Sequence, residues 1–179
     1  MKFDGDAPEL DPIDLAILEQ LQENCKLPLT AIGEKVGLKA PSVLERIHKL
    51  EGAGVIQHYV AILDARRLGR DVTAFIGVKI GRAQAISVVE AAAEGFDEIL
   101  DCHHVTGSHT LMLKVKTEDT EALEGVIDRL REIDGVTGTE TMVVLSTHTE
   151  RTRIALPVEE AAPPRRRRSA RPKRALGSS

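Results

Sequence analysis

The chain has 179 residues and a formal net charge of −4; 42% of its residues are hydrophobic, but only 2% are aromatic. This length suits one ordinary domain or two small ones, with a core of aliphatic side chains. No apolar run is long enough to cross a membrane, and the acidic start MKFDGDAPELD lacks the hydrophobic segment of a secretory signal. Cys25 and Cys102 have no CxxC spacing, which favours a reducing cytoplasm over a disulfide framework.

The first part of the chain predicts three helices. Asp11 and Pro12 are typical of the N-cap and first residue of a helix over 11–24. Residues 27–59 then predict two short amphipathic helices, joined by a turn at Gly37 and ended at Gly52. Two helices that meet at a short glycine-containing turn form a helix-turn-helix, whose second helix can enter the major groove of DNA.

The outward face of the second helix is basic. Arg46 suits a bidentate contact to guanine, while the lysines suit phosphates. The alternative is a solvated basic face on which Arg46 pairs with a neighbouring acid such as Glu45 or Glu51. The candidate DNA-binding residues are Lys35, Lys39, Ser42, Arg46 and Lys49.

The pattern changes after this helix. Residues 55–64 are β-branched and partly alternating, which predicts a strand leading away from the helices. From residue 72 the order strand, helix, strand, strand, helix, strand is that of the split βαβ, or ferredoxin-like, arrangement. Thr117 is the predicted N-cap of the last helix. Because both helices would cover one face of the sheet, the other face is left for a partner, which favours a dimer.

The sequence therefore predicts an α+β chain in five parts. These are a flexible N-terminus (1–9), a winged helix-turn-helix domain (10–62), a linker (63–71), a ferredoxin-like effector-binding and oligomerisation domain (72–152), and a disordered Arg-rich tail (153–179).

The tail carries seven basic residues and no acid after Pro164, a charge of +7. Because the net charge of the whole chain is −4, residues 1–164 carry a net charge of −11. Concentrated positive charge of this kind predicts contacts with DNA phosphates. The alternative is a solvated extension that contacts nothing. The candidate contacts are Arg165, Arg166, Arg167, Arg168, Arg171, Lys173 and Arg174.

Several segments together carry a family resemblance: LDPIDLAILEQLQ, IGEKVGL, VLERIHKLEGAGVIQHY, and DCHHVTG followed by LMLKV. Over roughly residues 10–150 the chain resembles the leucine-responsive (Lrp/AsnC, or feast/famine) transcriptional regulators. The resemblance implies a winged-helix DNA-binding domain and a ligand-sensing domain that dimerises and often assembles into tetramers or octamers. It also implies a small effector, usually an amino acid, bound between dimers near a Gly-Asp-x-Asp turn.

The chain departs from the family at that turn. Its residues there are Gly107, Ser108, His109 and Thr110, so no carboxylate is present to pair with an effector's ammonium group. Losing a buried charge-assisted bond weakens binding by about 1.5–3 kcal/mol, so the effector differs or the site is degenerate. The resemblance adds Thr139 and Thr141 of the last strand to the effector site, although a threonine is also favoured simply by a strand.

A metal site, a cofactor and an enzymatic activity are not expected. Cys102, His103, His104, His109 and His148 invite a metal hypothesis, but Cys102 and His104 would point to one face of a strand and His103 to the other. No P-loop, GxGxxG after a strand, GxSxG or HExxH occurs. The expected protein is a cytoplasmic, nucleoid-associated, homo-oligomeric regulator that binds double-stranded DNA and senses a small metabolite. Two alternatives stay open, a nucleoid-organising protein and an enzyme similar to the sirohaem decarboxylases, which share this architecture.

Overall fold

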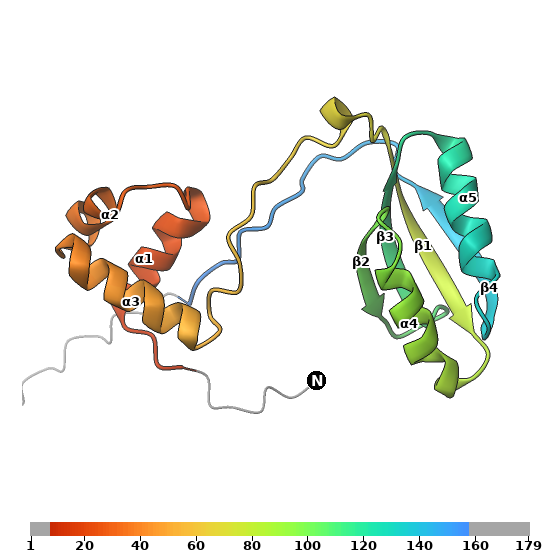
Figure 1. Cartoon of the computed structure of the whole chain (residues 1–179), viewed down its shortest axis with the longest axis horizontal. Helices are drawn as coiled ribbons and strands as arrows, with labels where there is room; N and C mark the ends of the chain where they lie inside the picture. Colours follow the sequence, from red (N-terminus) through yellow and green to blue (C-terminus); the bar gives the residue numbers. More distant parts are fainter. Residues whose placement is uncertain (1–7, 158–179) are drawn as a thin grey trace, which may run out of the picture. The chain divides into compact units, whose positions relative to one another are not determined.

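The computed structural model describes residues 8–157, so most of the predicted flexible N-terminus and the tail from residue 158 lie outside it. The chain divides into two compact units (Figure 1). The helical unit comprises the residues up to Val60 together with those from Arg151 onward, and the sheet unit comprises Ala61–Glu150. The chain therefore passes between the two units twice.

The helical unit contains the three predicted helices, α1 (Pro12–Glu23), α2 (Leu29–Val36) and α3 (Ala40–Gly52). Asp11 is the N-cap of α1, as predicted, and it forms a capping box with Asp14. The three helices bury one aliphatic cluster between them, consisting of Ile17, Leu18, Ile32, Val43, Ile47 and Leu50. Burial of these side chains holds helices that are individually too short to be stable in water.

Two glycines make the turn between α2 and α3 possible. Gly37 ends α2 with a φ of 73°, in the left-handed region where a side chain is disfavoured. Gly33 is buried one helical turn earlier, and a Cβ there would lie 2.3 Å from the carbonyl oxygen of Leu38. The backbone after the turn thus packs directly on α2, which sets where α3 begins.

The strand predicted over 55–64 is wrong. Residues 53–64 form no strand, and a single 3-10 turn, η1 (Arg66–Leu68), precedes the sheet. A strand needs a neighbour to pair its backbone groups, and this segment has none within the described chain. Its apolar side chains Tyr59, Val60, Ile62 and Leu63 are consequently exposed.

The sheet unit has the predicted βαββαβ order. Its elements are β1 (Val72–Ile80), η2 (Ala83–Ala85), α4 (Ile86–Glu94), β2 (Ile99–His104), β3 (Leu111–Thr117), α5 (Thr120–Arg131) and β4 (Val136–Val143). The strand order is β2-β3-β1-β4 and every pair is antiparallel, which confirms the ferredoxin-like arrangement.

The N-cap of α5 is Asp119 rather than the predicted Thr117. The Asp119 carboxylate accepts a hydrogen bond of 2.8 Å from the N–H of Ala122. Thr117 is buried at the end of β3, where its hydroxyl donates to the carbonyl of Asp119. Both residues are good N-caps, but the strand continues through Thr117, so only Asp119 is free to adopt the cap geometry.

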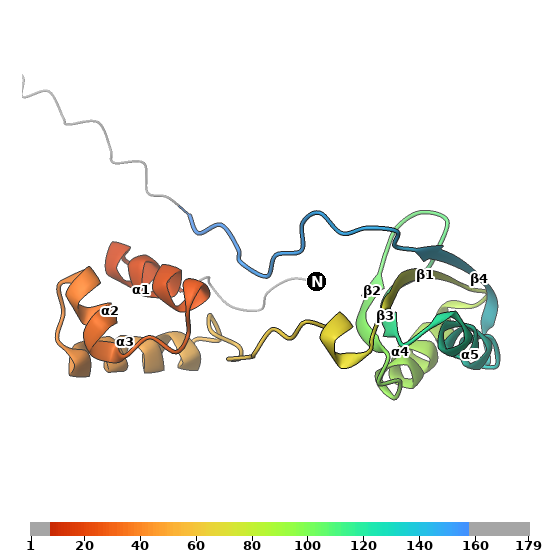
Figure 2. The ribbon, with the colours of Figure 1, turned by 90° about the horizontal axis from the view of Figure 1, so that it is seen from above.

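Both α4 and α5 lie on the same side of the sheet (Figure 2). The core between helices and sheet consists of alternate strand residues, among them Ile76, Leu113 and Val115, packed on Val89 and Val126. The opposite side is covered by no element of the sheet unit, and we call it the open face. On it the cross-strand neighbours Phe75 and Met142 are exposed. Among the described residues no helix is long and apolar enough to span a membrane.

Candidate nucleic-acid interface and effector site

Four of the five predicted DNA contacts are exposed on the helix-turn-helix. Lys35 lies in the last turn of α2, Lys39 is the N-cap residue of α3, and Ser42 and Lys49 lie on α3 itself. The Lys35 amine donates a hydrogen bond to the side chain of Gln20. No side chain caps the amino end of α3, where Pro41 has no N–H and the N–H groups of Ser42 and Val43 both donate to the Lys39 carbonyl.

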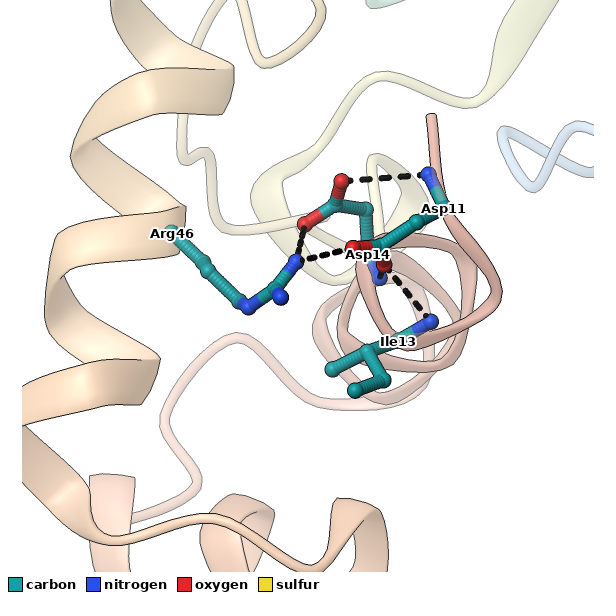
Figure 3. Close-up of polar contacts among 4 residues, drawn as sticks. All are labelled: Asp11, Ile13, Asp14 and Arg46. Atoms are coloured by element: carbon teal, nitrogen blue, oxygen red, sulfur yellow. Dashed lines mark hydrogen bonds and ion pairs between the residues drawn. The ribbon is translucent and has the colours of Figure 1, made fainter. Parts of the chain in front are cut away.

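Arg46, the predicted base-reading residue, is placed differently. Its Nη1 lies 2.7 Å from the carboxylate of Asp11, the N-cap of α1, and 2.6 Å from that of Asp14 in the first turn of α1 (Figure 3). The Asp14 side chain is only 4% exposed. The ion pair raises the pKa of Arg46. The guanidinium thus joins α3 to α1, and a base contact by Arg46 stays a prediction.

The partners of Arg46 are also different from those considered from sequence. Glu45 and Glu51 are its neighbours on α3, but neither pairs with it in the described structure. Glu51 instead accepts a hydrogen bond of 2.9 Å from the hydroxyl of Tyr59, which lies in the segment after α3. Burial, followed by this contact with Glu51, raises the pKa of Tyr59 to about 12. The sequence indicated Asp11 only as the N-cap of a helix and gave Asp14 no role.

The predicted effector turn connects β2 and β3. Gly107 has a φ of 119°, which favours glycine at that position. The Thr110 N–H donates to the carbonyl of Val78 at 2.8 Å, and its hydroxyl accepts from the N–H of Ile80. Thr110 therefore holds the turn against β1.

His109 lies on the open face at this turn. Its ring packs on Gly77 of β1, where a Cβ would come within 2.6 Å of the imidazole. The Nδ1 atom is 3.1 Å from the Ser108 hydroxyl, and Nε2 is 3.0 Å from the carboxylate of Glu140 on β4. Glu140 was not among the effector-binding residues predicted from the sequence. It lies opposite Gly77 in the sheet and so brings a carboxylate to the β2–β3 turn, which has none of its own. The Glu140 side chain is 61% exposed.

The two threonines of β4 are not brought together with this turn. Thr139 pairs with Val78 and Thr141 with Ile76, and both partners face the helices. Because residues directly opposite one another share a face, the threonines lie on the side of the sheet away from His109. Thr139 accepts a hydrogen bond of 2.9 Å from Arg131 of α5. The predicted effector residues thus form two separate groups within one chain.

The described residues contain no group of three or more metal-ligating side chains. Pairing of β2 with β3 places Cys102 and His104 on the helix side and His103 on the open face, as alternation predicted. Burial, with the charges of Glu90 and Glu94, raises the pKa of the Cys102 thiol.

Comparison with known proteins adds two family matches. Residues 10–51 match the AsnC-type helix-turn-helix domain, and residues 73–154 match the Lrp/AsnC ligand binding domain. The chain is 38% identical to the HTH-type transcriptional regulator FL11 of Pyrococcus horikoshii, over 82% of this chain and 97% of that protein. It is 31% identical to the transcriptional regulator AzlB of Bacillus subtilis, over 84% of this chain and 97% of AzlB.

Solved structures agree with these matches. The transcriptional regulator NMB0573 of Neisseria meningitidis, in its complex with L-Met, superposes with a TM-score of 0.78 at 30% identity, covering 82% of this chain and 97% of that one. AsnC of E. coli superposes with a TM-score of 0.77 at 28% identity, covering 82% and 99% of the two chains.

Proposed function

Because the chain belongs to the Lrp/AsnC family of transcriptional regulators, we propose that it is a sequence-specific regulator that binds double-stranded DNA and responds to an amino acid. The observation that supports the DNA-binding part is a set of exposed residues along α3, with Lys39 and Ser42 at its amino end and Lys49 in its last turn. Ser42 is suited to a base edge or a phosphate, and the lysines to phosphates. As part of this proposal, the protein binds its DNA in the cytoplasm, at the nucleoid.

A homodimer is part of this proposal. Phe75 and Met142 expose apolar surface on the open face, and Tyr59, Ile62 and Leu63 expose more in the segment after α3. Exposed apolar surface of this kind is suited to an interaction with another protein, and a second copy of the chain would cover it. The two recognition helices of such a dimer would meet half-sites about one helical turn of DNA apart. Tetramers or octamers would arise from further contacts between dimers.

The effector proposal centres on the β2–β3 turn. A regulator of similar structure is seen in complex with L-Met. In the present chain Ser108, His109 and Glu140 converge on the open face. Glu140 offers the carboxylate that an amino acid's ammonium group requires, and which the turn itself lacks. The effector would act by binding one assembly of the protein better than another, since equal affinity for both would shift nothing.

The deciding experiment is fluorescence anisotropy with the DNA upstream of the protein's own gene and a scrambled duplex, across several salt concentrations. Tight binding that prefers the upstream DNA and survives moderate salt supports a specific regulator. Equal binding to both duplexes that collapses with salt would contradict sequence specificity.

A second candidate function is that of a nucleoid-organising protein. It is favoured by the seven basic residues between Arg165 and Arg174, a segment outside the described structure. Such charge supplies sequence-independent affinity. The same anisotropy titration separates the two functions through the ratio of specific to non-specific affinity. The sirohaem-decarboxylase alternative predicts a coloured, tetrapyrrole-binding protein, whereas the relatives described above are named transcriptional regulators.

A further inference from the structure

The chain passes for the second time from the sheet unit to the helical unit between Glu150 and Arg151. We call residues 150–157 the strap. They belong to the segment after β4, which is drawn in blue in Figure 1. No helix or strand forms over these residues, yet the strap is attached at two places, one in each unit.

The first anchor is Glu150, which pairs with two lysines of β3. Its carboxylate contacts the amine of Lys114 and lies 3.7 Å from that of Lys116. The lysine side chains are only 21% and 20% exposed, and both lie on the open face, because Lys114 is opposite Phe75 and alternate residues of a strand share a face. Two cations on one face repel, and Glu150 brings a negative charge to both. These contacts, the one with Lys114 first, hold the pKa of Glu150 below its ordinary value.

The second anchor attaches the strap to α1. The side-chain amide of Gln22 accepts a hydrogen bond from the N–H of Ile154 at 2.7 Å and donates one to the Ile154 carbonyl at 3.1 Å. Glu19 pairs with Arg153 at 2.6 Å, and Leu156 packs on the aliphatic core of the three helices. The strap residues Arg153, Ile154 and Leu156, predicted from the sequence to belong to the disordered tail, therefore contact the helical unit in a defined register.

Each of these contacts is weak when taken singly. The side chains of Glu150, Glu19 and Arg153 are about half exposed, and ion pairs and hydrogen bonds at such sites contribute little to stability. Each anchor is thus the sum of small contributions. An attachment of this kind is specific in position and can still be released.

The spacing of the two anchors along the chain determines what the strap does. Glu150 and Arg153 are three residues apart, a length of chain that spans at most about 11 Å. The other connection between the units runs from Tyr59, which contacts α3, to Val72 at the start of β1, and this length of chain reaches roughly 45 Å. We propose that the strap is a releasable second connection that restricts the movement of the helix-turn-helix against the sheet unit. Because the two anchors act in series, loss of either one leaves only the longer connection.

Such a restriction would assist DNA binding, and this consequence rests on the proposed function. A dimer must present its two recognition helices to half-sites at a fixed spacing. Freedom that the strap has already removed is not lost again when the DNA binds, so the attached strap favours binding. Release of the strap would weaken DNA binding without the loss of any contact to the DNA.

Variants at the two ends release the strap independently. Gln22→Ala removes the hydrogen bonds to Ile154 and places a strong helix former on α1. Glu150→Ala removes the anion between the two lysines. The matched controls are Gln84→Ala and Glu124→Ala, which replace an exposed glutamine of η2 and an exposed glutamate of α5. All variants are made in the full chain.

The anchor on α1 is tested by limited trypsin digestion with mass spectrometry. Cleavage after Arg153 requires Ile154 to leave Gln22, and cleavage after Arg82, which is 70% exposed at the start of η2, is the internal reference. Cleavage of a transiently opened segment follows the population of the open form. We therefore expect Gln22→Ala to raise the ratio of the two rates about 2- to 10-fold, the factor that one lost hydrogen bond supplies. The ratio should not change in Gln84→Ala, and an unchanged ratio in Gln22→Ala would overturn this anchor.

The restriction itself is measured as a distance distribution by double electron–electron resonance. Cys25 lies in the helical unit and Cys102 in the sheet unit, and both are exposed, so the native chain takes one spin label in each unit. The labelled chain is mixed with an excess of unlabelled chain in which both cysteines are replaced by serine, so that label pairs within one chain dominate.

We expect narrow distributions for the wild type and the two control variants, and broader ones for Gln22→Ala and Glu150→Ala. The double variant should be no broader than the single variants, because either release is sufficient. Equal widths in all these proteins would contradict the proposal. Broadening by only one of the two strap variants would contradict it as well, since anchors in series must both be needed.

Anisotropy on the upstream DNA then tests the consequence for binding. We expect both strap variants to bind several-fold more weakly than the wild type. Gln22→Ala, a neutral substitution, should leave the dependence on salt unchanged, because no phosphate contact is lost. Unchanged affinity together with a broadened distribution would overturn the role of the strap in DNA binding. Absence of DNA binding by the wild-type chain would instead contradict the proposed function, and the distance distributions would still decide whether the strap restricts the two units.

Discussion

Arg46 of α3 and Asp14 of α1 form an ion pair at 2.6 Å in which the aspartate is almost completely buried. A basic residue on the recognition helix thereby serves to fix the position of that helix. Lys39 and Lys49 are exposed, and we propose that they carry the charge available to DNA. On this proposal, stability and DNA affinity depend on different basic residues in and next to α3.

Replacing Arg46 with methionine should destabilise the helical unit by about 1–3 kcal/mol, because Asp14 is left buried without its cation. The chain has one tyrosine, Tyr59, and no tryptophan, so tyrosine fluorescence reports on this unit. For a domain of this size each kcal/mol lowers the melting temperature by roughly 4–8 °C. Lys49→Met is the matched control and should weaken DNA binding with a nearly unchanged melting curve. The reverse pattern would support a base-reading role for Arg46.

The stability contributed by Asp11 should depend on pH in a defined direction. Its pKa is lowered from 3.8 by the hydrogen bond from the Asp14 N–H and by Arg46. A carboxyl group whose pKa is lowered by folding contributes stability above its unfolded pKa and loses it as the pH falls through the folded value. Asp11→Asn keeps a good N-cap but removes this titration.

We therefore expect the wild-type chain to be more stable than Asp11→Asn at neutral pH, with the difference shrinking as the pH falls below about 4. Tyrosine fluorescence melting curves from pH 7 to pH 3 measure it. A difference that stays constant over this range would show that Arg46 is satisfied by Asp14 alone.

Gly33→Ala should disrupt the turn between α2 and α3. The new Cβ would lie 2.3 Å from a backbone oxygen, which cannot rotate away, so α3 must shift. We expect a loss of about 1–3 kcal/mol in stability and a marked loss of DNA affinity, measured by melting and anisotropy. Gly52→Ala is the control, because a Cβ there meets nothing within 4 Å, and it should be neutral or slightly stabilising. Normal DNA binding by Gly33→Ala would contradict the tight packing of this turn.

Glu140→Gln should abolish or weaken the response to an amino-acid effector while leaving the fold intact. Removing the charge from an ammonium partner costs about 1.5–3 kcal/mol, or roughly 10- to 150-fold in affinity. A panel of amino acids is screened by thermal shift on the wild type, and the hit is then titrated against the variant. Glu124→Gln, an exposed residue of α5, controls for the loss of one negative charge. Equal affinity in both variants would remove Glu140 from the effector site.

Local features of the sequence were sufficient for most of the fold. Asp11 followed by Pro12 indicated where α1 begins, Gly37 indicated the turn, and helical periodicity identified the residues that form the helical core. The order of strands and helices from Val72 onward predicted the ferredoxin-like sheet. These features depend on interactions between residues close in sequence, or on burial patterns that repeat along one element.

Tertiary structure alone decided which distant side chains meet. Arg46 pairs with residues more than thirty positions away, Glu140 reaches His109 from another strand, and Gln22 holds a segment 132 residues further along the chain. The apolar pattern of residues 55–64 predicted a strand, yet a strand requires a partner, and residues 8–157 supply none there. Periodicity records which face of an element is buried, whereas the partner of a polar group depends on how separate elements pack.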